Sequence, residues 1–587
     1  MNPYSAEQNI FLISMYIRSK KVKAQNGETY EYEQLVESYR AGGKTKQRVV
    51  MTLGKKGEVT GDRVEEIIRT LMKKNPTLEL VRQFDRKTPD LKIHSSKELG
   101  AYLVFRHLWE KIGLQTAVEA IAPRGGGKEK DFAEMIFLLT LYRILSPGSE
   151  RRMAHIFEPQ VYHRLSSVPS LNEWYRAISR LQKNRSSVED EAYRRIKGMF
   201  PGKMSLMYFD TTSLVLFGDY RRSEIARFGM SKDKRSDKKQ VVVGLVLNEH
   251  GLPVGITEEN GNAVDVKNFI SMLKKMKKKY GASQMIFVGD KGMNSKANRE
   301  VLKAENQQYI LGVRSGMEKK VSEEILKNDF EWTKAPKLEY SKNQQKLVMQ
   351  LKKREDMGEK DFHTRVIERS LDGRRMVFFY NPLEKHAEET KRDQIIRALK
   401  KKVKTITGLK QLIGNKGYRS LITFGSVKKE RKKGNKEQPV TVLIDHQKIE
   451  RMKCFDGITV VETNTELPTL EVVKQYKQLI TVEQSFSDLK STMECRPIYH
   501  KTDTNIRGHI FINFLGLLLY YLFFHLLSGH FEESTRYEII QALRDIQAHE
   551  VEQNGRRYVI RTELTPLFQN ICSILKLKPS PRILGTL

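Results

Sequence analysis

Apolar residues are spaced in different ways along this chain, and the spacing divides the chain into regions. Near the N-terminus, apolar and polar positions roughly alternate over residues 11–22, 30–39 and 47–53. Alternation with a period of two is typical of strands, and the pairs Asn26-Gly27 and Gly42-Gly43 between these stretches are turn signals. The sequence therefore predicts a small antiparallel β-meander.

The meander and a periodic stretch over residues 61–83 together form the predicted first domain, residues 1–95, in which the periodic stretch is a linker helix. Lysine and arginine side chains decorate the predicted strands. They either contact DNA or form the solvated faces of a small sheet.

From residue 96 to residue 200 the apolar positions recur every three or four residues, which predicts a helical domain. Trp174 lies at helical spacing among apolar neighbours, so we expect it in the core. A longer apolar run, Ile510–Leu527, contains Asn513 and His525 in an otherwise polar chain. We expect this run to be a buried core helix, and a membrane span is the less favoured alternative.

Short apolar strands begin at residue 204 and include Met204–Phe209 and Gln284–Val288, with an amphipathic helix predicted over Val264–Lys279. Antiparallel strands followed by alternating strands and helices indicate an α/β fold with a mixed sheet. This α/β domain covers residues 201–315 and 441–530. A β-rich, basic insertion of residues 316–440 interrupts it, and residues 531–587 are predicted to be a helical C-terminal region.

The charge of the chain narrows the choice of partner. Lysine and arginine number 104 against 71 aspartate and glutamate, so the formal charge is +33 and the pI is about 9.7. Such a field attracts polyanions. Nucleic acid is the first candidate partner and an anionic membrane surface the second. The alternative is a basic, soluble protein whose charge serves no such partner.

The three cysteines contain no CxxC pair, which argues against zinc fingers and against a disulfide framework. The first residues lack a basic segment before the apolar run and make a poor signal peptide. We therefore expect a cytoplasmic protein. A phosphate loop of the GxxxxGK[ST] type is missing from the sequence, so no ATP dependence is expected.

Three carboxylates are candidates for chemistry. Asp210 and Asp290 each follow a predicted apolar strand, and Glu483 lies on a predicted helix, Glu471–Lys490. Magnesium prefers oxygen ligands, and two such ions can activate a nucleophile and stabilise the leaving oxygen of a phosphodiester. Each aspartate alone is more commonly a turn residue at a strand end, but the set of three is harder to explain by chance.

The predicted helix has a buried stripe and a polar shoulder. The stripe recurs at three- or four-residue spacing and comprises Val472, Leu479, Val482, Phe486, Leu489 and Met493. Tyr476, Glu483 and Lys490 are seven residues apart and share the shoulder. The alternative is a surface helix with ordinary polar residues.

Three motifs resemble the DDE triad of insertion-sequence transposases, above all insertion-sequence family four and its relatives. They are YFDTTS around Asp210, FVGDKGM around Asp290 and YKQLITVEQSFSDLK around Glu483. The family helix carries a Tyr-x2-Arg-x3-Glu-x6-Lys signature, in which Leu479 here replaces the arginine. The later segment CRPIYHKTDTNIRGHIFINFL is also similar to that group.

The resemblance implies a ribonuclease-H-like catalytic domain with Asp210, Asp290 and Glu483 as catalytic and metal-binding residues, holding two Mg²⁺ or Mn²⁺ ions. It implies binding of terminal inverted repeats in double-stranded DNA, then cleavage and strand transfer into target DNA, with Tyr476 and Lys490 on end-DNA phosphates. Joining two ends needs two active sites, so a homodimer is expected in the synaptic complex. The implied place is the cytoplasm of a prokaryotic cell, at the nucleoid.

Further basic residues are candidate DNA contacts, and each has a plainer interpretation. Lys232 and Arg235 lie in a segment that is equally plausible as a solvated loop. Arg496 and His500 follow the predicted helix, and for His500 a packed or surface histidine is the commoner case. In the insertion, Arg374 and Arg375 are expected on an exposed basic platform for DNA, together with Lys400, Lys401 and Lys402. The alternative is an insertion that only braces the catalytic sheet.

Two alternatives to a transposase remain open on the sequence. One is a metal-dependent nuclease without strand transfer. The other is a non-catalytic DNA-binding derivative, against which the presence of all three carboxylates argues.

Overall fold

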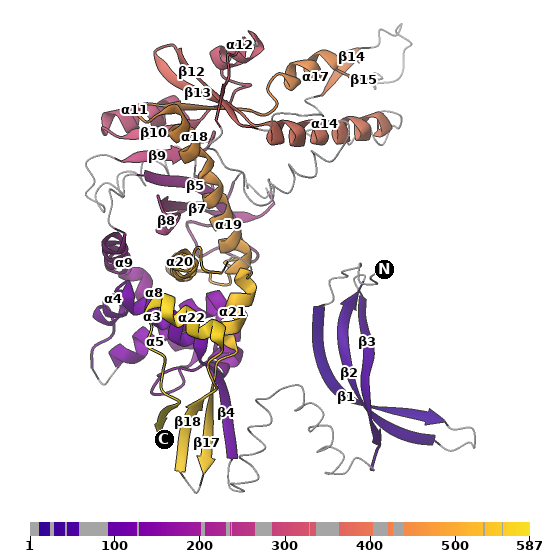
Figure 1. The fold of residues 1–587 in the computed structure, drawn as a ribbon, viewed down its shortest axis with the longest axis vertical. Coiled ribbons are helices and arrows are strands. Elements are labelled where there is room, and N and C mark those ends of the chain that lie inside the picture. Colours follow the sequence, from indigo (N-terminus) through magenta and orange to yellow (C-terminus); the bar gives the residue numbers. More distant parts are fainter. Residues whose placement is uncertain are drawn as a thin grey trace. The chain divides into compact units, whose positions relative to one another are not determined.

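A computed structural model describes the chain in ranges separated by gaps (Figure 1). The described residues are 11–23, 29–41, 44–57, 92–125, 128–200, 206–229, 235, 237–263, 285–327, 329–335, 363–402, 421–426, 440–531, 534–553 and 556–586. The chain forms two compact units. The first comprises residues 1–96, 549–560 and 582–587, and the second comprises residues 97–548 and 561–581.

The first unit contains the predicted meander. Its strands are β1 (Phe11–Lys23), β2 (Thr29–Ala41) and β3 (Lys44–Lys55), which pair antiparallel in the order β1-β2-β3. Val36 of β2 is fully buried, while the described side chains of residues 19–23 are exposed. The alternation that predicted the meander therefore corresponds to a sheet with a small apolar side.

A second sheet has the order β19-β18-β17-β4 and corrects the prediction of a wholly helical C-terminal region. Its strands are β4 (Lys92–Glu98), β17 (Gln547–Gln553), β18 (Arg556–Arg561) and β19 (Ile583–Thr586). Asn554-Gly555 between β17 and β18 was an available hairpin signal. The helical part of the prediction is confirmed by α21 (Arg536–Arg544) and α22 (Pro566–Leu575).

The predicted helical domain is present in the second unit. Its longer helices are α3 (Gly100–Lys111), α4 (Leu114–Ala120), α5 (Lys128–Leu145), α8 (Leu171–Lys183) and α9 (Arg185–Met199). Three short helical segments follow α5, namely α6 (Glu150–Arg152), η1 (Met153–Phe157) and α7 (Glu158–Gln160). Ser170 begins α8 with a capping box, and Trp174 is fully buried, as the spacing predicted.

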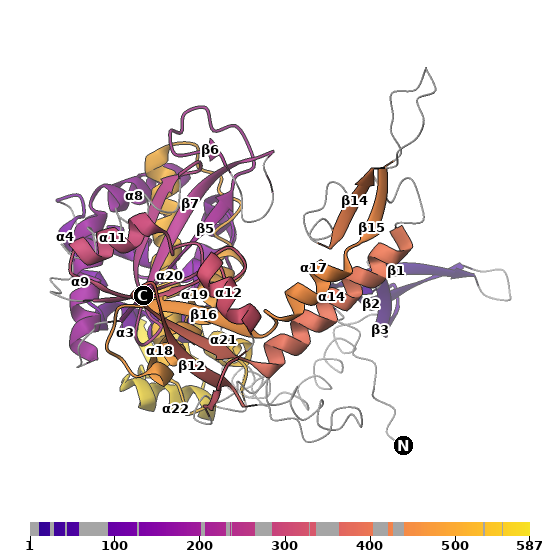
Figure 2. The ribbon, with the colours of Figure 1, turned by 90° about the horizontal axis from the view of Figure 1, so that it is seen from above.

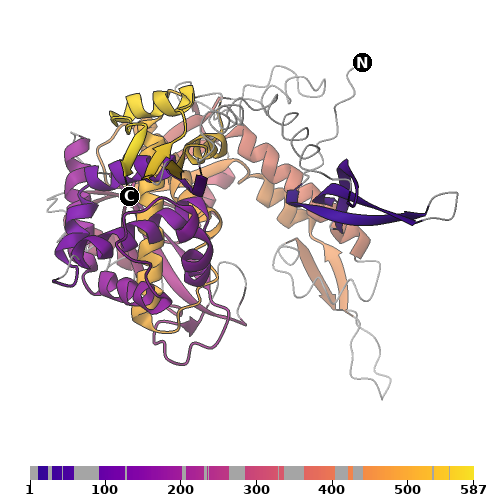
Figure 3. The ribbon, with the colours of Figure 1, turned by 90° about the horizontal axis from the view of Figure 1, so that it is seen from below.

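The apolar run forms α20 (Asp503–Leu526), which lies among α3, α5 and α8 (Figure 3). Among the described residues α20 alone is long and apolar enough to cross a membrane, and 83% of its most apolar window is buried inside the protein. Asn513 and His509 within it are buried as well. These findings fit the expected core helix.

A ten-stranded mixed sheet, counted over the described residues, lies at the centre of the second unit. Its path is β11-β12-β13-β16-β10-β9-β5-β7-β6, and β8 pairs with β7. In chain order, its first six strands are β5 (Leu206–Val215), β6 (Arg227–Phe228), β7 (Lys239–Asn248), β8 (Pro253–Asn260), β9 (Ile286–Gly289) and β10 (Gln308–Gly312). Strand β5 is antiparallel to β7 and parallel to β9, and β9 is parallel to β10.

The inserted segment divides differently from the predicted range. Strands β11 (Thr333–Lys334), β12 (Arg365–Leu371) and β13 (Arg374–Tyr380) extend the central sheet, because β13 pairs along its length with β16 (Ile458–Thr463). Aromatic and β-branched residues such as Val377 and Phe378 are fully buried there. Helix α12 (Lys319–Lys327) packs on β13 and β16, and α11 (Lys296–Ala304) contacts β10.

The remaining described part of the insertion packs with residues beyond 440, up to Lys453, around a small core of its own. Together they form α14 (Pro382–Lys402), α17 (His446–Lys453) and the separate strand pair β14 (Ile422–Ser426) and β15 (Val440–Ile444) (Figure 2). Leu399, Leu421, Ile422 and Ile449 are buried together. The predicted helices at 61–83 and Val264–Lys279 lie outside the described residues.

Candidate active site

Asp210 lies inside β5, five residues before its end, and pairs across the sheet with Leu245. The sequence predicted that the strand would end at Phe209. The strand continues because the residues after Asp210 pair with β7, and four of these five, Thr211, Thr212, Leu214 and Val215, have β-branched or apolar side chains. The Asp210 side chain is buried, and its Oδ1 accepts the Thr211 backbone N–H at 2.7 Å.

Asp290 follows β9 directly, as the sequence predicted. Strands β5 and β9 are parallel with Phe209 opposite Gly289, so the next residues along them, Asp210 and Asp290, lie at neighbouring positions on adjacent strands. Oδ1 of Asp290 accepts the backbone N–H groups of Gly292 at 2.9 Å and Met293 at 3.1 Å. This turn fixes the orientation of the carboxylate at the sheet edge.

Glu483 reaches the site from a helical stretch in three segments, α18 (Thr469–Lys477), α19 (Leu479–Ser487) and η3 (Asp488–Thr492). The prediction of one regular helix over 471–490 is wrong in this respect. At Gln478 the backbone N–H is shared between the carbonyls of Lys474 and Gln475, both at 3.2 Å, which interrupts the regular pattern. The predicted apolar stripe is confirmed, since all six of its residues are buried.

The two helices pack on different strands. Helix α18 packs on β9 and β10, and α19 packs on β5 and β7. Tyr208 of β5 donates a hydrogen bond to Gln475 of α18, which ties the helix to the strand that carries Asp210. Glu483 itself is exposed, on the helix that packs on the strand of Asp210.

Tyr476 links the second and third carboxylates. Burial raises the pKa of its hydroxyl, and the negative charges of Asp290 and Glu483 raise it further. The phenol is therefore protonated at neutral pH. Its oxygen lies against Gly312 of β10, where an added Cβ would collide with it and would also come within 3.0 Å of Lys291.

The three carboxylates fit a site for divalent cations by their chemistry. They supply only oxygen ligands, which hard cations such as Mg²⁺ prefer. Asp210 and Asp290 are held by backbone N–H groups, while Glu483 is exposed to solvent. Such a site can bind metal and a phosphodiester together.

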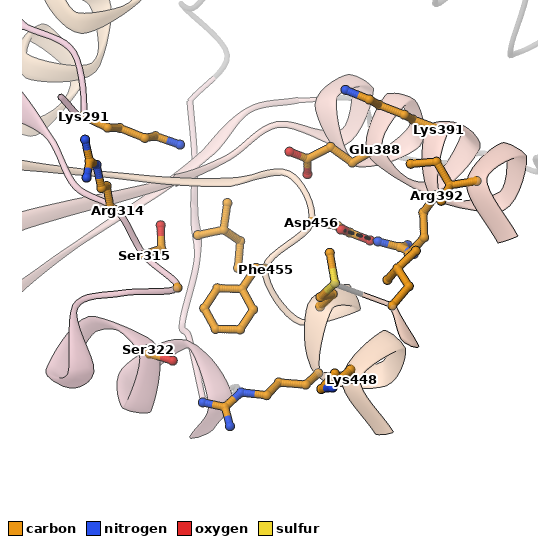
Figure 4. Close-up of a pocket in the computed structure, with 16 residues that line it drawn as sticks. Lys291, Arg314, Ser315, Ser322, Glu388, Lys391, Arg392, Lys448, Phe455 and Asp456 are labelled. Carbon is orange, nitrogen blue, oxygen red and sulfur yellow. Dashed lines mark hydrogen bonds and ion pairs between the residues drawn. The ribbon is translucent and has the colours of Figure 1, made fainter. Parts of the chain in front are cut away.

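A cationic cleft of about 690 Å³ begins at Lys291, the residue after Asp290 (Figure 4). Its lining contains six basic residues and two acidic ones, which are Lys291, Arg314, Lys391, Arg392, Lys448, Arg451, Glu388 and Asp456. Arg392 is neutralised by Asp456, at 2.6 and 2.5 Å. The sequence does not reveal this cleft, because its walls come from the segment after β10 and from α12, α14 and α17, which only the fold brings together.

Arg374 and Arg375 do not form the exposed platform that the sequence predicted. Arg374 binds Glu318 at 2.7 Å and the buried carboxylate of Glu462 at 3.3 Å. Arg375 binds Glu368 at 2.8 Å and the Thr465 carbonyl at 2.6 Å. Both arginines therefore link β13 to neighbouring carboxylates and to the Thr465 carbonyl. All of these partners except Glu368 are distant in sequence, so the sequence pattern does not reveal them.

Two predicted DNA contacts lie together near the end of β5. Arg235 and Arg496 line a cavity of about 370 Å³ with Val215, Phe217 and Pro497. Arg235 also pairs with Asp237 at 2.8 and 2.9 Å. The structure thus brings Arg235 and Arg496 to the strand that carries Asp210, and their role in DNA binding stays a prediction.

The other predicted contacts have different surroundings. Lys490 is half-buried in η3, and Lys232 lies outside the described residues. His500 is buried, with its ring edge-on to Tyr175 at 5.5 Å and to His509 at 5.4 Å. Its burial favours the packed-histidine alternative.

Comparison with known proteins gives two family matches. Residues 17–79 match the IS1634 family transposase N-terminal domain, and residues 202–368 match the transposase DDE domain. The second match contains Asp210 and Asp290 and ends before Glu483. Together the matches support a DDE-type insertion-sequence transposase, an enzyme of DNA transposition and recombination.

The other comparisons add little. None of the curated proteins matches this chain. Among solved structures, a piggyBac transposase synaptic complex with hairpin DNA is 12% identical, with 76% of this chain and 79% of that chain covered and a TM-score of 0.35. A Mos1 transposase paired-end complex is also 12% identical, covering 32% of this chain and 61% of that chain, with a TM-score of 0.14. Likenesses this weak do not bear on fold or function.

Proposed function

We propose that this chain binds the terminal inverted repeats of an insertion sequence and catalyses metal-dependent cleavage and strand transfer of its ends. The observation that carries the proposal is the neighbouring position of Asp210 and Asp290 on the parallel strands β5 and β9, with the helix of Glu483 packed on β5. The finer grouping with insertion-sequence family four is part of the proposal, as is a prokaryotic cytoplasmic location.

The arrangement of strands supports a ribonuclease-H-like catalytic domain. Strands β8, β7 and β5 are antiparallel neighbours, and β9 and β10 continue from β5 in parallel. Asp210 lies on β5, the first of these strands in chain order, and Asp290 directly follows β9, the fourth. Carboxylates placed on rigid central strands keep the geometry that metal-assisted chemistry requires.

Asp210, Asp290 and Glu483 would hold Mg²⁺ or Mn²⁺, with two ions expected. When bound, such ions activate a water or a DNA hydroxyl and stabilise the leaving oxygen of the phosphodiester. The two backbone hydrogen bonds to Asp290 fix its carboxylate. Tyr476, protonated between Asp290 and Glu483, can donate its hydroxyl proton to a phosphate oxygen.

The cationic cleft is the proposed path for DNA leaving the carboxylates. Lys291 borders both Asp290 and the cleft, and Lys391, Lys448 and Arg451 continue the positive lining. Contacts of this kind to phosphates set the position of a duplex without reading its bases. A homodimer in the synaptic complex would supply two such sites for two ends.

Cleavage of labelled end DNA tests the catalytic assignment. Asp210→Asn, Asp290→Asn and Glu483→Gln should each lower metal-dependent cleavage by roughly 100-fold or more, since even supporting groups of metal sites cost 10- to 100-fold. End binding in a gel shift should persist. Glu466→Gln, which removes an exposed carboxylate ahead of α18, is the matched control and should cleave normally.

Two results would count against the proposal. Full cleavage by any of the three variants would remove that residue from the site. Cleavage that never yields a joined product, with target DNA and both ends supplied, would favour the metal-dependent nuclease over a transposase. Loss of binding to every DNA in all variants would indicate misfolding, which circular dichroism identifies.

A further inference from the structure

A second group of metal-ligating side chains lies apart from the three carboxylates. Glu150 at the start of α6, His500 before α20 and His509 within α20 are all buried. One ligand atom from each lies within 4.8 Å of the other two. None of these three residues is one of the proposed catalytic carboxylates.

The contacts of His509 place one of its ring nitrogens, as an acceptor, beside another acceptor. Nε2 lies 3.0 Å from the Cys495 carbonyl oxygen, which can only accept, so Nε2 carries the proton. In the neutral ring Nδ1 is then an acceptor. It lies 3.0 Å from Oε1 of Glu150, which is also an acceptor. Two lone pairs at this distance call for a positive centre between them.

His500 places a second imidazole nitrogen beside the same oxygen. Its Nε2 lies 3.2 Å from the same Oε1, yet makes no hydrogen bond of acceptable geometry, and only 6% of the residue is exposed. A buried polar atom without a hydrogen bond is costly unless something else satisfies it. Its position beside Oε1 and Nδ1 suits a ligand of the same ion.

Arg143 supplies only part of the positive charge that this cluster calls for. Its Nη2 donates to Oε1 of Glu150 at 2.6 Å and lies 3.4 Å from Nδ1 of His509. Its Nη1 is turned to the Gly148 carbonyl at 2.5 Å. The guanidinium therefore contacts both the Glu150 carboxylate and Nδ1 of His509, while Nε2 of His500 is left without a hydrogen bond.

We propose that Glu150, His500 and His509 bind a zinc-class divalent transition-metal ion. Two imidazoles and one carboxylate are a ligand set that Zn²⁺ accepts, with bonds of about 2.0–2.2 Å and a fourth position for water. Metal-binding histidines donate their other N–H to a carbonyl or carboxylate, and ligating carboxylates are themselves hydrogen-bonded. The Cys495 carbonyl and Arg143 provide these supports.

The bound ion would act as a structural tie. It joins the helical domain through Glu150 to α20 and to the segment that follows Glu483 and carries Arg496. The rival occupant is a second proton on His509, which would satisfy Glu150 without any metal. Metal content and thermal stability distinguish the two.

The experiment uses the full chain with Asp210→Asn and Asp290→Asn, which removes catalytic metal binding. The protein is stripped with a chelator, exposed to Zn²⁺ or Co²⁺, desalted, and analysed for metal by mass spectrometry and for Tm. We expect about one ion per chain, as a single tetrahedral site requires. The Tm should rise on reloading with Zn²⁺ and should not rise with Mg²⁺ at the same concentration.

Substitutions then locate the ion. His500→Gln and His509→Gln in the same background should each lose the retained Zn²⁺ and its effect on Tm. His107→Gln is the matched control, because His107 is also packed in the helical domain against a backbone carbonyl, that of Leu575 at 3.1 Å. Absence of retained metal in the parent chain, with Tm unchanged by Zn²⁺, would overturn the proposal, as would equal metal retention in all three variants.

Discussion

At the scale of single residues, the contact between Gly312 and Tyr476 determines how closely α18 approaches the sheet. A side chain at residue 312 would collide with the Tyr476 hydroxyl and press on Lys291. Tyr476 in turn lies within the electrostatic reach of Asp290 and Glu483. A glycine here is therefore a requirement of the site geometry and not of backbone conformation.

Gly312→Ala should lower cleavage by displacing Tyr476 or Lys291 while leaving the fold intact. Tyr476→Phe removes the hydroxyl with which the new Cβ collides. In the Tyr476→Phe background, Gly312→Ala should therefore lower cleavage less than it does in the parent chain, and a double-mutant cycle measures this difference. The measurement is cleavage of end DNA by all four proteins. Gly198→Ala, where an added Cβ meets nothing within 4 Å, is the control. Strict additivity would show that the contact does not matter.

His525 gives the protein a pH-dependent stability term. Burial lowers its pKa, and the neighbouring His250 lowers it further. The folded state therefore binds the proton less readily than the unfolded state, whose histidine pKa is about 6.5. The stability contributed by neutral His525 is full above that value and is lost as pH falls through it toward the lower folded value.

Urea unfolding at pH 7.5 and pH 5.0 checks this sign. The free energy of unfolding should be higher at pH 7.5, and His525→Gln should show a smaller difference between the two pH values than the parent chain. An unchanged difference would mean that other groups account for the pH dependence.

At the scale of elements, a buried arginine joins α9 to β8 and α20. Arg185 binds Glu189 at 2.6 Å and Glu258 at 2.6 and 2.7 Å, and its guanidinium lies 4.8 Å from the ring of Phe511. Despite burial, the two carboxylates keep the pKa of Arg185 raised. This network connects the helical domain to the central sheet through charges for which the sequence pattern indicates no partner.

Arg185→Met should destabilise the protein by about 3–5 kcal/mol, because it leaves Glu189 buried without its cation and Glu258 with only the longer contact to Arg507 at 3.5 Å. Chemical denaturation measures the change. Arg194→Met is the matched control on the same helix. It breaks an exposed pair with Glu191, 2.6 Å apart, and should cost about 1 kcal/mol or less. Equal effects of the two substitutions would show that the buried network contributes nothing special.

At the scale of the whole molecule, the net charge of +33 includes many arginines that are neutralised internally. Arg374, Arg375 and Arg392 all pair with carboxylates, whereas Lys391 and Arg451 line the cationic cleft. The distribution of cations therefore predicts DNA affinity better than the total charge does.

DNA affinity should fall steeply with salt, since each neutralised phosphate contributes about −0.9 to the slope of log K against log salt. Lys391→Gln with Arg451→Gln should weaken end binding and make this slope shallower by up to roughly 2 if both side chains contact phosphates. Lys111→Gln with Lys183→Gln removes the same charge from exposed positions of α3 and α8. Identical slopes for the two double variants would exclude the cleft as the DNA path.

Much of the local structure could be predicted from the sequence. The meander, the helices of the helical domain, the buried stripe from Val472 to Met493 and the core position of Trp174 follow from periodicity. The motifs around Asp210, Asp290 and Glu483 pointed to the residues that the fold brings to one edge. These signals are local, because period, turn chemistry and motif spacing are properties of neighbouring residues.

Tertiary structure decided what depends on partners distant in sequence. Because β5 pairs with β7 beyond Asp210, the strand does not end where the sequence predicted. Because β13 pairs with β16, the first part of the insertion belongs to the central sheet. The cleft beside Lys291 and the cluster of Glu150 with His509 have the same origin. A charge or an imidazole has no fixed role in the sequence, because its role is set by the groups that packing places within a few ångströms of it.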